Sequence, residues 1–395
     1  MLTIREAMEI EAFKKVKLIA GKEGIDRVIE SVTVMEVTDT VQWLEGGEFI
    51  ITSFYSVRDK IDEQCDIVYR LGKLNAAGIA IKINKYVPRI PDKLIKIANE
   101  LKLSMFEIPS DVTYLSIMTP LNQKIFRLKE HFMIVEEYVK GIIFHTYKTI
   151  DSVIERGKAL GYDIKEGYIC AVTVDIDGYD NPDLMSIRDR LYKYIDSITR
   201  ALKRKKQIIN YIIVRNAEYV TLFLQSDNKI NAERYEKEVL NLILKYRDIY
   251  YKNTGMTIGI GNIGYGISGI EDGYDQAKYA IKLGRVIGKK QDYYFYKDIE
   301  IYSLVYKNSS DVLHSVVRST LGKILDEAEL METISTYFEC NESIKLTSEM
   351  LFIHKNTLKY RLERIRMITG LDVKNIDDKV RLYLAIIANS ILTKK

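Results

Sequence analysis

The chain has 395 residues, of which 59 are Lys or Arg and 55 are Asp or Glu, so its formal net charge is +4, and 47% of its residues are hydrophobic. This composition provides cores for two or three domains and excludes a disordered chain. The first fifteen residues are charged throughout, which excludes a signal peptide, and no apolar run approaches the roughly 20 residues that span a bilayer. Three scattered cysteines indicate reduced thiols rather than a disulfide framework or zinc site, so we expect a soluble cytoplasmic protein with no membrane partner.

Residues 1–127 alternate helix-like and strand-like segments, which predicts an α/β domain with a largely parallel sheet. Thr3 is expected to cap a first helix that runs through Phe13, and Glu6 is spaced from it for a capping box. The expected strands are Val16–Gly21, Val28–Val37, Glu48–Thr52, Gly78–Ile83 and Met105–Pro109. The other expected helices are Lys60–Ala77 and Pro91–Lys102.

Polar and aromatic residues gather around the strand ends of this first domain, where α/β sheets usually bind ligands. They are Met35, Glu36, Trp43, Glu45, Gly46, Gly47, Glu48 and Thr52. We take Met35, Glu36, Trp43, Glu48 and Thr52 as candidate effector-binding residues. The alternative is that Gly46-Gly47 is only a turn and Trp43 is a core residue.

Residues 128–165 form a connecting helical segment, and the helical pattern itself starts near Pro120. Apolar residues recur there at three- and four-residue steps: Ile125, Leu128, Phe132, Val135 and Val139. Such a seam accommodates another helix, either a neighbour in the same chain or the same helix of a second subunit.

Residues 166–297 predict a second α/β unit. Its expected strands are Tyr168–Asp180, a hairpin over Ile208–Gln225 that turns at Arg215–Glu218, and Met256–Gly261. Its expected helices are Pro182–Lys206, Ala232–Tyr251 and a last one over GYDQAKYAIKLGRVIG.

This order, with the pair Asp175-x-Asp177 before a hairpin, resembles a nucleotide-cyclase domain of the GGDEF type. Such enzymes surround two Mg²⁺ ions with carboxylates, and the ions orient a triphosphate. Here Arg215 and Asn216 stand where the family's turn has glycines, and of the turn only Glu218 and Tyr219 match. We therefore expect a cyclase-like fold without cyclase activity and without a metal site.

Glycines recur in the run GNIGYGISG, before the last helix of this domain. A glycine-rich loop before a helix can bind phosphate. The spacing matches neither a P-loop nor a dinucleotide fingerprint, so a structural loop is the preferred interpretation.

The segment from Ile344 to Ile368 predicts two helices joined by a tight turn at Phe352–His354. In the second helix apolar residues recur at Leu358, Leu362 and Ile365, which places one apolar stripe on one face. This is the pattern of a DNA-reading helix-turn-helix, whose second helix enters the major groove with its N-terminal residues against base edges.

The candidate DNA-binding residues occupy the other faces of that helix: His354, Lys355, Asn356, Thr357, Lys359, Tyr360, Arg361 and Arg364. Asn pairs with adenine, Thr contacts a base edge or a thymine methyl, and Lys or Arg reaches guanine or phosphate. His354 is expected to cap the helix or touch phosphate. The other histidines are too distant in sequence to suggest a metal site.

Charge is concentrated in the same segment, because six positive and two negative side chains give it the net +4 of the whole chain. The alternative is a helical hairpin in a bundle with a solvated basic face.

The run HKNTLKYRLERI, followed by TGLD and DDKVRLYLAIIANSIL, resembles the C-terminal DNA-binding domain of PucR/CdaR-type bacterial transcription regulators. One departure is Ser348, where that family often has Ala. The N-terminal runs LTIREAM, IAGKEGIDRVIESVTVMEV, WLEGGEFIITSF and GIAIKI resemble the same family's first domain. The resemblance implies an effector-sensing domain, a degenerate GGDEF-like domain and an all-α DNA-binding domain.

We therefore predict an α/β and α+β multidomain protein: residues 1–127 sense an effector, 166–297 are GGDEF-like, and 298–395 are helical and end in the helix-turn-helix. The expected function is transcription regulation, of purine or related catabolism, by a homodimer or higher oligomer that binds double-stranded operator DNA and a small-molecule effector, with no catalytic residue and no cofactor. The alternatives are a nucleotide cyclase-like enzyme using the middle domain and an interaction protein whose terminal helices only dimerise.

Overall fold

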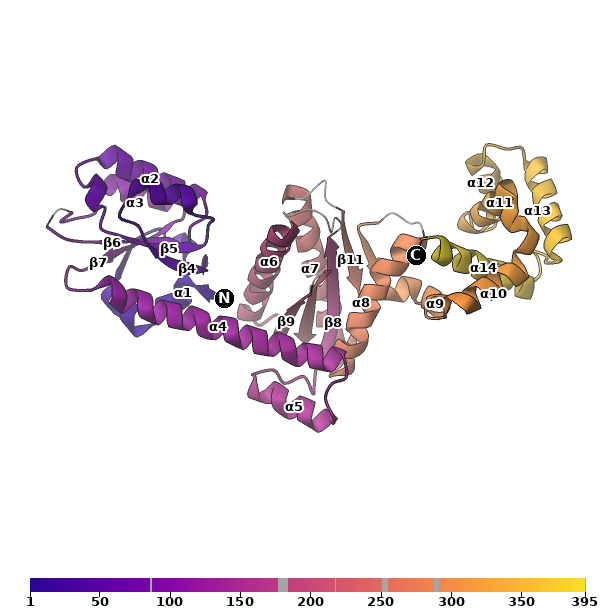
Figure 1. Cartoon of the computed structure of the whole chain (residues 1–395), viewed down its shortest axis with the longest axis horizontal. Helices are drawn as coiled ribbons and strands as arrows, with labels where there is room; N and C mark the ends of the chain where they lie inside the picture. The colour runs from indigo at the N-terminus through magenta and orange to yellow at the C-terminus, as the bar shows by residue number, and fades with distance from the viewer. Residues whose placement is uncertain (86, 177–183, 217, 251–254, 288–290, 395) are drawn as a thin grey trace. The chain divides into compact units, whose positions relative to one another are not determined.

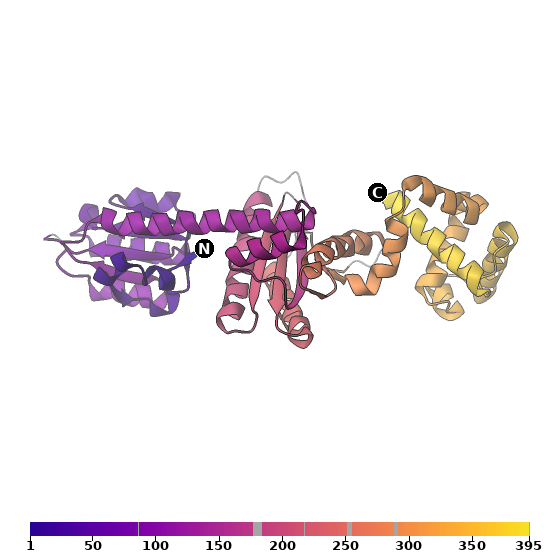
Figure 2. The same cartoon turned by 90° about the horizontal axis from the view of Figure 1, so that it is seen from below.

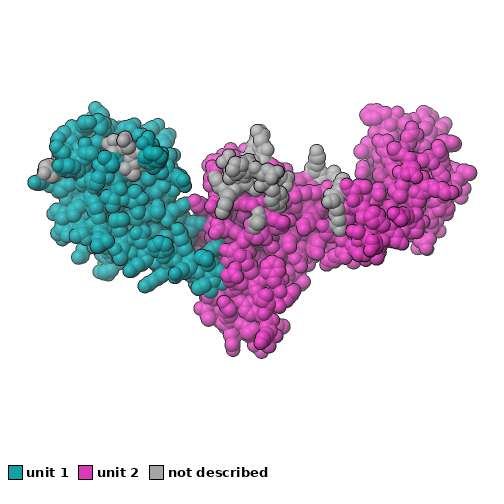
Figure 3. Space-filling view, in the orientation of Figure 1, with its two compact units in different colours: residues 1–135 teal, residues 136–395 magenta. Residues whose placement is uncertain are grey.

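The computed structural model describes residues 1–85, 87–176, 184–216, 218–250, 255–287 and 291–394. The chain divides into two compact units, residues 1–135 and 136–395 (Figure 3). The first unit therefore ends inside the predicted connecting helix, eight residues beyond the predicted domain end at 127. None of the helices in the described ranges is both long and apolar enough to cross a bilayer.

Unit 1 is built on a five-stranded sheet in the order β2-β7-β6-β5-β4. Strands β4 to β7 are parallel, and only β2 runs antiparallel, against β7. Their bounds are β2 Lys17–Ala20, β4 Ser31–Val34, β5 Glu48–Thr52, β6 Gly78–Lys82 and β7 Ser104–Ile108. A separate two-stranded ribbon pairs β1 (Leu2–Thr3) with β3 (Val28–Ile29). The largely parallel sheet predicted from the alternating pattern is confirmed.

Both faces of this sheet are covered, which is why its strands are apolar on both sides. On one face α2 (Ile61–Lys73) and α3 (Asp92–Glu100) pack side by side over a single core (Figure 1). On the other face lie α1 (Ile4–Ala7), the 3-10 helix Glu11–Lys15 and the first half of α4 (Tyr114–Ile143). The predicted capping box of α1 is present, because Thr3 Oγ1 accepts from Glu6 N and the Glu6 carboxylate accepts from Thr3 N.

The predicted helical seam packs within the chain over part of its length. Ile125 belongs to the core of unit 1 and Val139 is fully buried in unit 2, whereas Leu128 and Phe132 are only partly buried. The packing within the chain accounts for part of the seam, and pairing with a second subunit stays a prediction. After α4 ends, His145 adopts φ 52°, and a second short helix, α5 (Ile150–Ala159), follows.

The middle part of unit 2 contains a six-stranded sheet in the order β13-β11-β8-β10-β9, with β12 beside β8. Figure 2 shows this part of the chain, with its sheet and helices, from a second side. The strands are β8 Tyr168–Ile176, β9 Asn210–Arg215, β10 Tyr219–Ser226, β11 Met256–Ile260, β12 Gly264–Tyr265 and β13 Tyr293–Phe295. The helices are α6 Leu184–Arg204, α7 Lys229–Tyr250 and α8 Ser268–Ile287. The predicted hairpin is present, with Arg215 opposite Val220 across β9 and β10.

The C-terminal part is helical throughout the described residues. Its helices are α9 Tyr296–Tyr306, α10 Ser310–Thr320, α11 Ala328–Glu339, α12 Ile344–Met350, α13 Lys355–Thr369 and α14 Ile376–Lys394. One continuous core joins α10, α11, α13 and α14. Within it Tyr302 on α9 and Tyr383 on α14 share a hydrogen bond of 2.7 Å between their hydroxyls. This core fixes the surface that α12 and α13 present.

Candidate nucleic-acid interface

The turn between α12 and α13 is held by local hydrogen bonds. Ser343 caps α12, and the backbone then turns at Phe352, whose φ of 53° is left-handed. Ile353 N donates to Ser348 O at 3.0 Å, which closes the turn. His354 caps α13 by accepting from Asn356 N at Nδ1 (3.2 Å), so the predicted capping role is present in the structure. Gly370, at φ 74°, ends the helix.

The predicted apolar stripe of α13 is buried in the C-terminal core. Leu358 and Ile365 are fully buried, and Leu362 is 8% exposed. Ser348 is also buried, and its hydroxyl donates to Lys345 O at 2.9 Å, so the hydroxyl that replaces the family's usual Ala is satisfied by backbone. Burial of this stripe sets the rotation of α13, and thereby decides which residues face solvent.

Seven of the eight candidate DNA-binding residues are exposed, all but Arg361. Six of the seven begin the helix: His354, Lys355, Asn356, Thr357, Lys359 and Tyr360. They lie on the first two turns of the helix, together with the N-terminal end of its dipole, which favours phosphate. A base-reading helix needs donors and acceptors at this end, with the opposite side packed on its own domain.

The remaining two candidates are engaged within the chain. Arg361 is largely buried and pairs with Glu329 at 3.0 Å, and Arg364 pairs with Glu327 at 2.7 Å. Both acids lie at the start of α11, so the two arginines tie α13 to its neighbour. Contact with phosphate would require either arginine to share or give up this partner. The sequence pattern could not separate them from Lys355 and Lys359, because all four lie off the apolar stripe.

Sequence reasoning missed an exposed apolar feature beside this surface. Phe352, in the turn, is 96% exposed, and Met350 and Leu346 of α12 are more than half exposed. The sequence did indicate that Phe352 is exposed, because this residue falls in the predicted turn and not on the apolar stripe of either helix.

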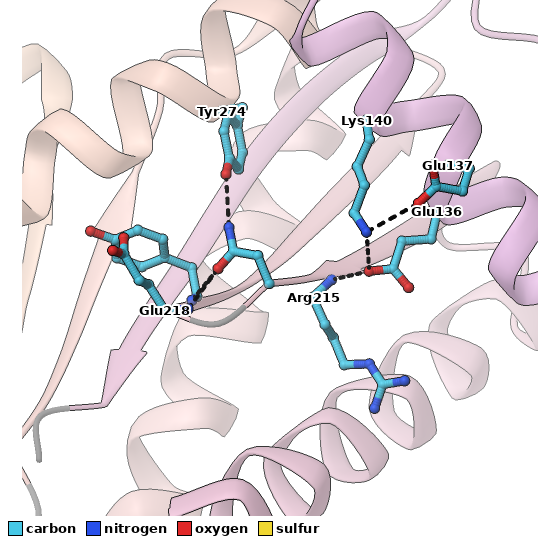
Figure 4. Close-up of polar contacts among 8 residues, drawn as sticks. Glu136, Glu137, Lys140, Arg215, Glu218 and Tyr274 are labelled. Carbon is cyan, nitrogen blue, oxygen red and sulfur yellow. Dashed lines mark hydrogen bonds and ion pairs between the residues drawn. The ribbon is translucent and has the colours of Figure 1, made fainter. Parts of the chain in front are cut away.

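The hairpin of the middle domain fills its own turn with side chains (Figure 4). Asn216 Oδ1 accepts from the backbone N–H groups of Glu218 (2.9 Å) and Tyr219 (2.6 Å), and its Nδ2 donates to Tyr274 Oη at 3.0 Å. Arg215 N donates to Glu136 Oε1 at 3.0 Å. Glycines at this turn would let the backbone approach a nucleotide closely, whereas here the Asn216 amide is bonded to the turn itself.

The Asp175 carboxylate, which the cyclase resemblance would make a metal ligand, is held by a cation instead. Its side chain is almost fully buried and pairs with Arg285 of α8 at 2.7 Å. Arg285 also donates to Thr257 Oγ1 at 3.0 Å. Asp177, the second member of the predicted pair, lies outside the described residues. No group of acids, histidines and cysteines that could hold a metal ion occurs in the described part of the chain.

The glycine-rich run of this domain serves close packing. A Cβ on Gly264 would lie 2.6 Å from the Cα of Gly269, and one on Gly269 would lie 2.8 Å from the Cβ of Ile169. These contacts bring the start of α8 against β12 and against β8. Close packing, which leaves no room for a Cβ, therefore explains the glycines at positions 264 and 269.

The candidate effector residues of unit 1 do not form one cluster. Met35 is a core residue and Thr52 is buried, both at the carboxyl ends of strands. Glu48 begins β5, about 13 Å along the strand from Thr52 at the usual rise per residue, and its carboxylate accepts from Glu45 N and Gly46 N. Glu48 therefore lies at the end of β5 opposite the carboxyl edge, where ligand sites of α/β sheets lie, and the role of the other candidates stays a prediction.

The last two effector candidates, Glu36 and Trp43, differ in how far they are exposed. Glu36 is half-buried and accepts from Ser53 N and Oγ and from Tyr114 Oη at 2.6–3.0 Å. Burial, together with the hydrogen bond to Glu36, raises the pKa of Tyr114. Trp43 is 77% exposed, so the alternative that it is a core residue is wrong.

Comparison with known proteins adds family matches to this geometry. Residues 6–125 match the purine catabolism regulatory protein-like family, residues 147–283 a GGDEF-like domain, and residues 330–388 the PucR C-terminal helix-turn-helix domain. The carbohydrate diacid regulator of Escherichia coli is 28% identical over 64% of this chain and 64% of its own length.

Two relatives from Bacillus subtilis match shorter stretches. The purine catabolism regulatory protein is 30% identical over 28% of this chain and 21% of its own length. The proline-responsive transcriptional activator PutR is 27% identical over 45% and 44%. The chain thus spans less than two thirds of the length of each of these relatives. With the matched segments at both ends and in the middle, the chain belongs to the PucR/CdaR type, with a PucR N-terminal domain, a GGDEF-like middle domain and a PucR-type helix-turn-helix.

Proposed function

We propose that this protein is a sequence-specific DNA-binding transcription regulator whose activity is controlled by a small-molecule effector. The observation that carries the proposal is that α13 has one buried face and an exposed start. Leu358 and Ile365 are buried in the C-terminal core. Lys355, Asn356 and Thr357 are exposed at the start of the helix. Base edges are read by such residues, and backbone phosphates are bound by the neighbouring lysines. We assign base readout to Asn356 and Thr357, and phosphate binding to Lys355 and Lys359.

The proposal includes a homodimer, because helix-turn-helix proteins read paired half-sites about one helical turn apart. The effector would bind unit 1 and shift the population of two arrangements of the dimer. The relatives' names support an effector drawn from small metabolites, since they refer to carbohydrate diacids, purine catabolism and proline. No catalytic step is part of this proposal.

The test is binding of the purified chain to DNA from upstream of its own gene and neighbouring operons, at several salt concentrations, with random DNA as competitor. We expect saturable, competitor-resistant binding and a protected site with two related half-sites. Binding that competitor DNA removes equally well at every salt concentration would leave α12 and α13 as a structural hairpin and contradict the proposal.

A further inference from the structure

A cavity of about 380 Å³ opens in unit 1 at the carboxyl edge of its parallel sheet. Its walls come from two connections, the one from β5 to α2 and the one from β6 to α3. Among its lining residues are Arg58, Asp59, Gln64, Arg89 and Asp92. Ligand sites of α/β sheets lie at this edge, and their cavities start at about 300 Å³. None of the effector candidates chosen from the sequence lines it.

Gln64 supplies a buried polar atom that is left unpaired at this cavity. The residue is 3% exposed, and its Nε2 donates to Val57 O (2.8 Å) and Arg58 O (3.2 Å). These two carbonyls fix the orientation of the amide, because a flipped amide would set its oxygen against both of them. The other atom, Oε1, is buried and meets no donor among the described residues. Buried acceptors of this kind are rare in native proteins, and a ligand N–H would satisfy this one.

The connection that carries Arg89 is held by two hydrogen bonds and two buried side chains. Val87 N donates to Asn84 Oδ1 at 2.9 Å, and Asn84 N donates to Val87 O at 3.1 Å. Val87 and Ile90 are buried in the sheet's core, and exposed Arg89 stands between these two anchors. Such preorganisation lowers the entropy lost when a ligand is bound.

The charges around the cavity favour a ligand with both an anionic and a donor group. Arg89 presents an exposed guanidinium group, which binds carboxylates in two-bond geometry. Arg58, stacked 4.8 Å above the Tyr55 ring, adds a second guanidinium, which pairs with Asp59 at 3.4 Å and would share this partner with a bound carboxylate. The positive ends of α2 and α3 lie at the same edge. Asp92 lines the cavity as well and offers an acceptor for N–H groups.

We propose that this cavity binds a small carboxylate that also carries an N–H group, such as an amide or an amine. The carboxylate lies at Arg58 and Arg89, and an N–H donates to Gln64 Oε1. That the ligand acts as the effector rests on the proposed function, whereas the binding itself does not depend on DNA.

The test uses the full-length chain and calorimetric titration with oxamate, the smallest stable compound with both a carboxylate and an amide. Acetate, which lacks the N–H, and formamide, which lacks the carboxylate, serve as matched probes. We expect oxamate to bind more tightly than either, and Arg89→Ala to weaken its binding about tenfold, as the loss of one charge-assisted contact does. Arg70→Ala, an exposed arginine further along α2, should change nothing.

Gln64→Met provides a second readout, because it removes the buried acceptor and keeps the volume. In this variant oxamate should lose its advantage over acetate. Absence of oxamate binding to the wild-type chain, or equal affinity in Arg89→Ala and wild type, would overturn the proposal. DNA binding measured on the same preparations keeps the two questions apart: oxamate binding without DNA binding contradicts the regulator, and DNA binding without oxamate binding contradicts the ligand site.

Discussion

The middle domain and the helix-turn-helix both contain residues of the kinds that bind nucleotides or nucleic acids. In the middle domain these residues are paired within the chain, whereas on the helix-turn-helix they are exposed. In the middle domain Asp175 is paired with Arg285, and Asn216 is bonded to its own turn and to Tyr274. On α13, Lys355 and Asn356 are exposed at the start of the helix. A side chain already satisfied inside its own chain has little left to offer a ligand, so the same residue types indicate function in one place and internal structure in the other.

The middle domain uses residues at the expected cyclase positions for pairing within the chain. Replacing glycines by Arg215 and Asn216 closes the turn, and Arg285 supplies the positive charge that a metal ion would otherwise bring to Asp175. Both changes improve internal pairing.

The largest expected effect tests the ion pair of the middle domain. Arg285→Ala should lower the free energy of unfolding by about 3 kcal/mol, because it leaves the Asp175 carboxylate buried without its partner cation. Chemical denaturation measures this loss, and Asp175→Asn in the same background should recover part of it. Stabilisation of the wild-type chain by Mg²⁺ that Asp175→Asn abolishes would show that the carboxylate is a metal ligand after all.

A second buried acid makes the stability of the middle domain depend on pH. Burial raises the pKa of Glu236 on α7 to about 7, and Glu233 raises it further while Lys297 and Lys237 oppose the shift. The folded state therefore binds the proton more tightly than the unfolded state. Stability should fall as pH rises from about 4.5 to about 7, by about 3 kcal/mol in total.

Glu236→Gln provides the control for this pH dependence. The variant should be more stable than wild type at pH 8 and should lack this part of the pH profile, as seen in denaturation at a series of pH values. Identical profiles for the two chains would contradict the assignment.

Substitutions on α13 should act on DNA binding and leave the fold intact. Asn356→Ala should relax preference at one base pair by about 2 kcal/mol, because a base-edge contact is lost. Lys359→Ala should instead weaken all sites alike and reduce the salt slope by about 1. Competition binding with single-base operator variants across salt separates the two effects. If Asn356→Ala weakened every site equally, base readout would belong to other residues.

The smallest expected effect concerns the cap of α13. His354→Ala should cost about 1 kcal/mol of unfolding free energy, because Asn356 N loses its acceptor, and His354→Asn should restore most of it. Thermal denaturation of the two variants measures the difference. An equal loss in both variants would mean that packing, and not the cap, stabilises this turn.

Much of the fold could be read from periodicity. Alternating segments predicted the parallel strands of unit 1, and the spacing of Leu358, Leu362 and Ile365 predicted the buried face of α13. These patterns are local consequences of which side chains leave water. The proposed ligand cavity was not predicted, since Arg58 and Gln64 follow β5, Arg89 follows β6, and only the parallel pairing of these two strands brings the residues together.

The sequence by itself determined the family, the order of the domains, the buried stripe of α13 and the cap of this helix, because each rests on neighbouring residues in one or two elements. Only the tertiary structure decided which polar groups remain available. Arg361 and Arg364 share the exposed pattern of Lys355 and Lys359, yet they pair with acids of α11, more than 30 residues earlier. Pairing between distant elements depends on how helices pack, and no local pattern encodes it.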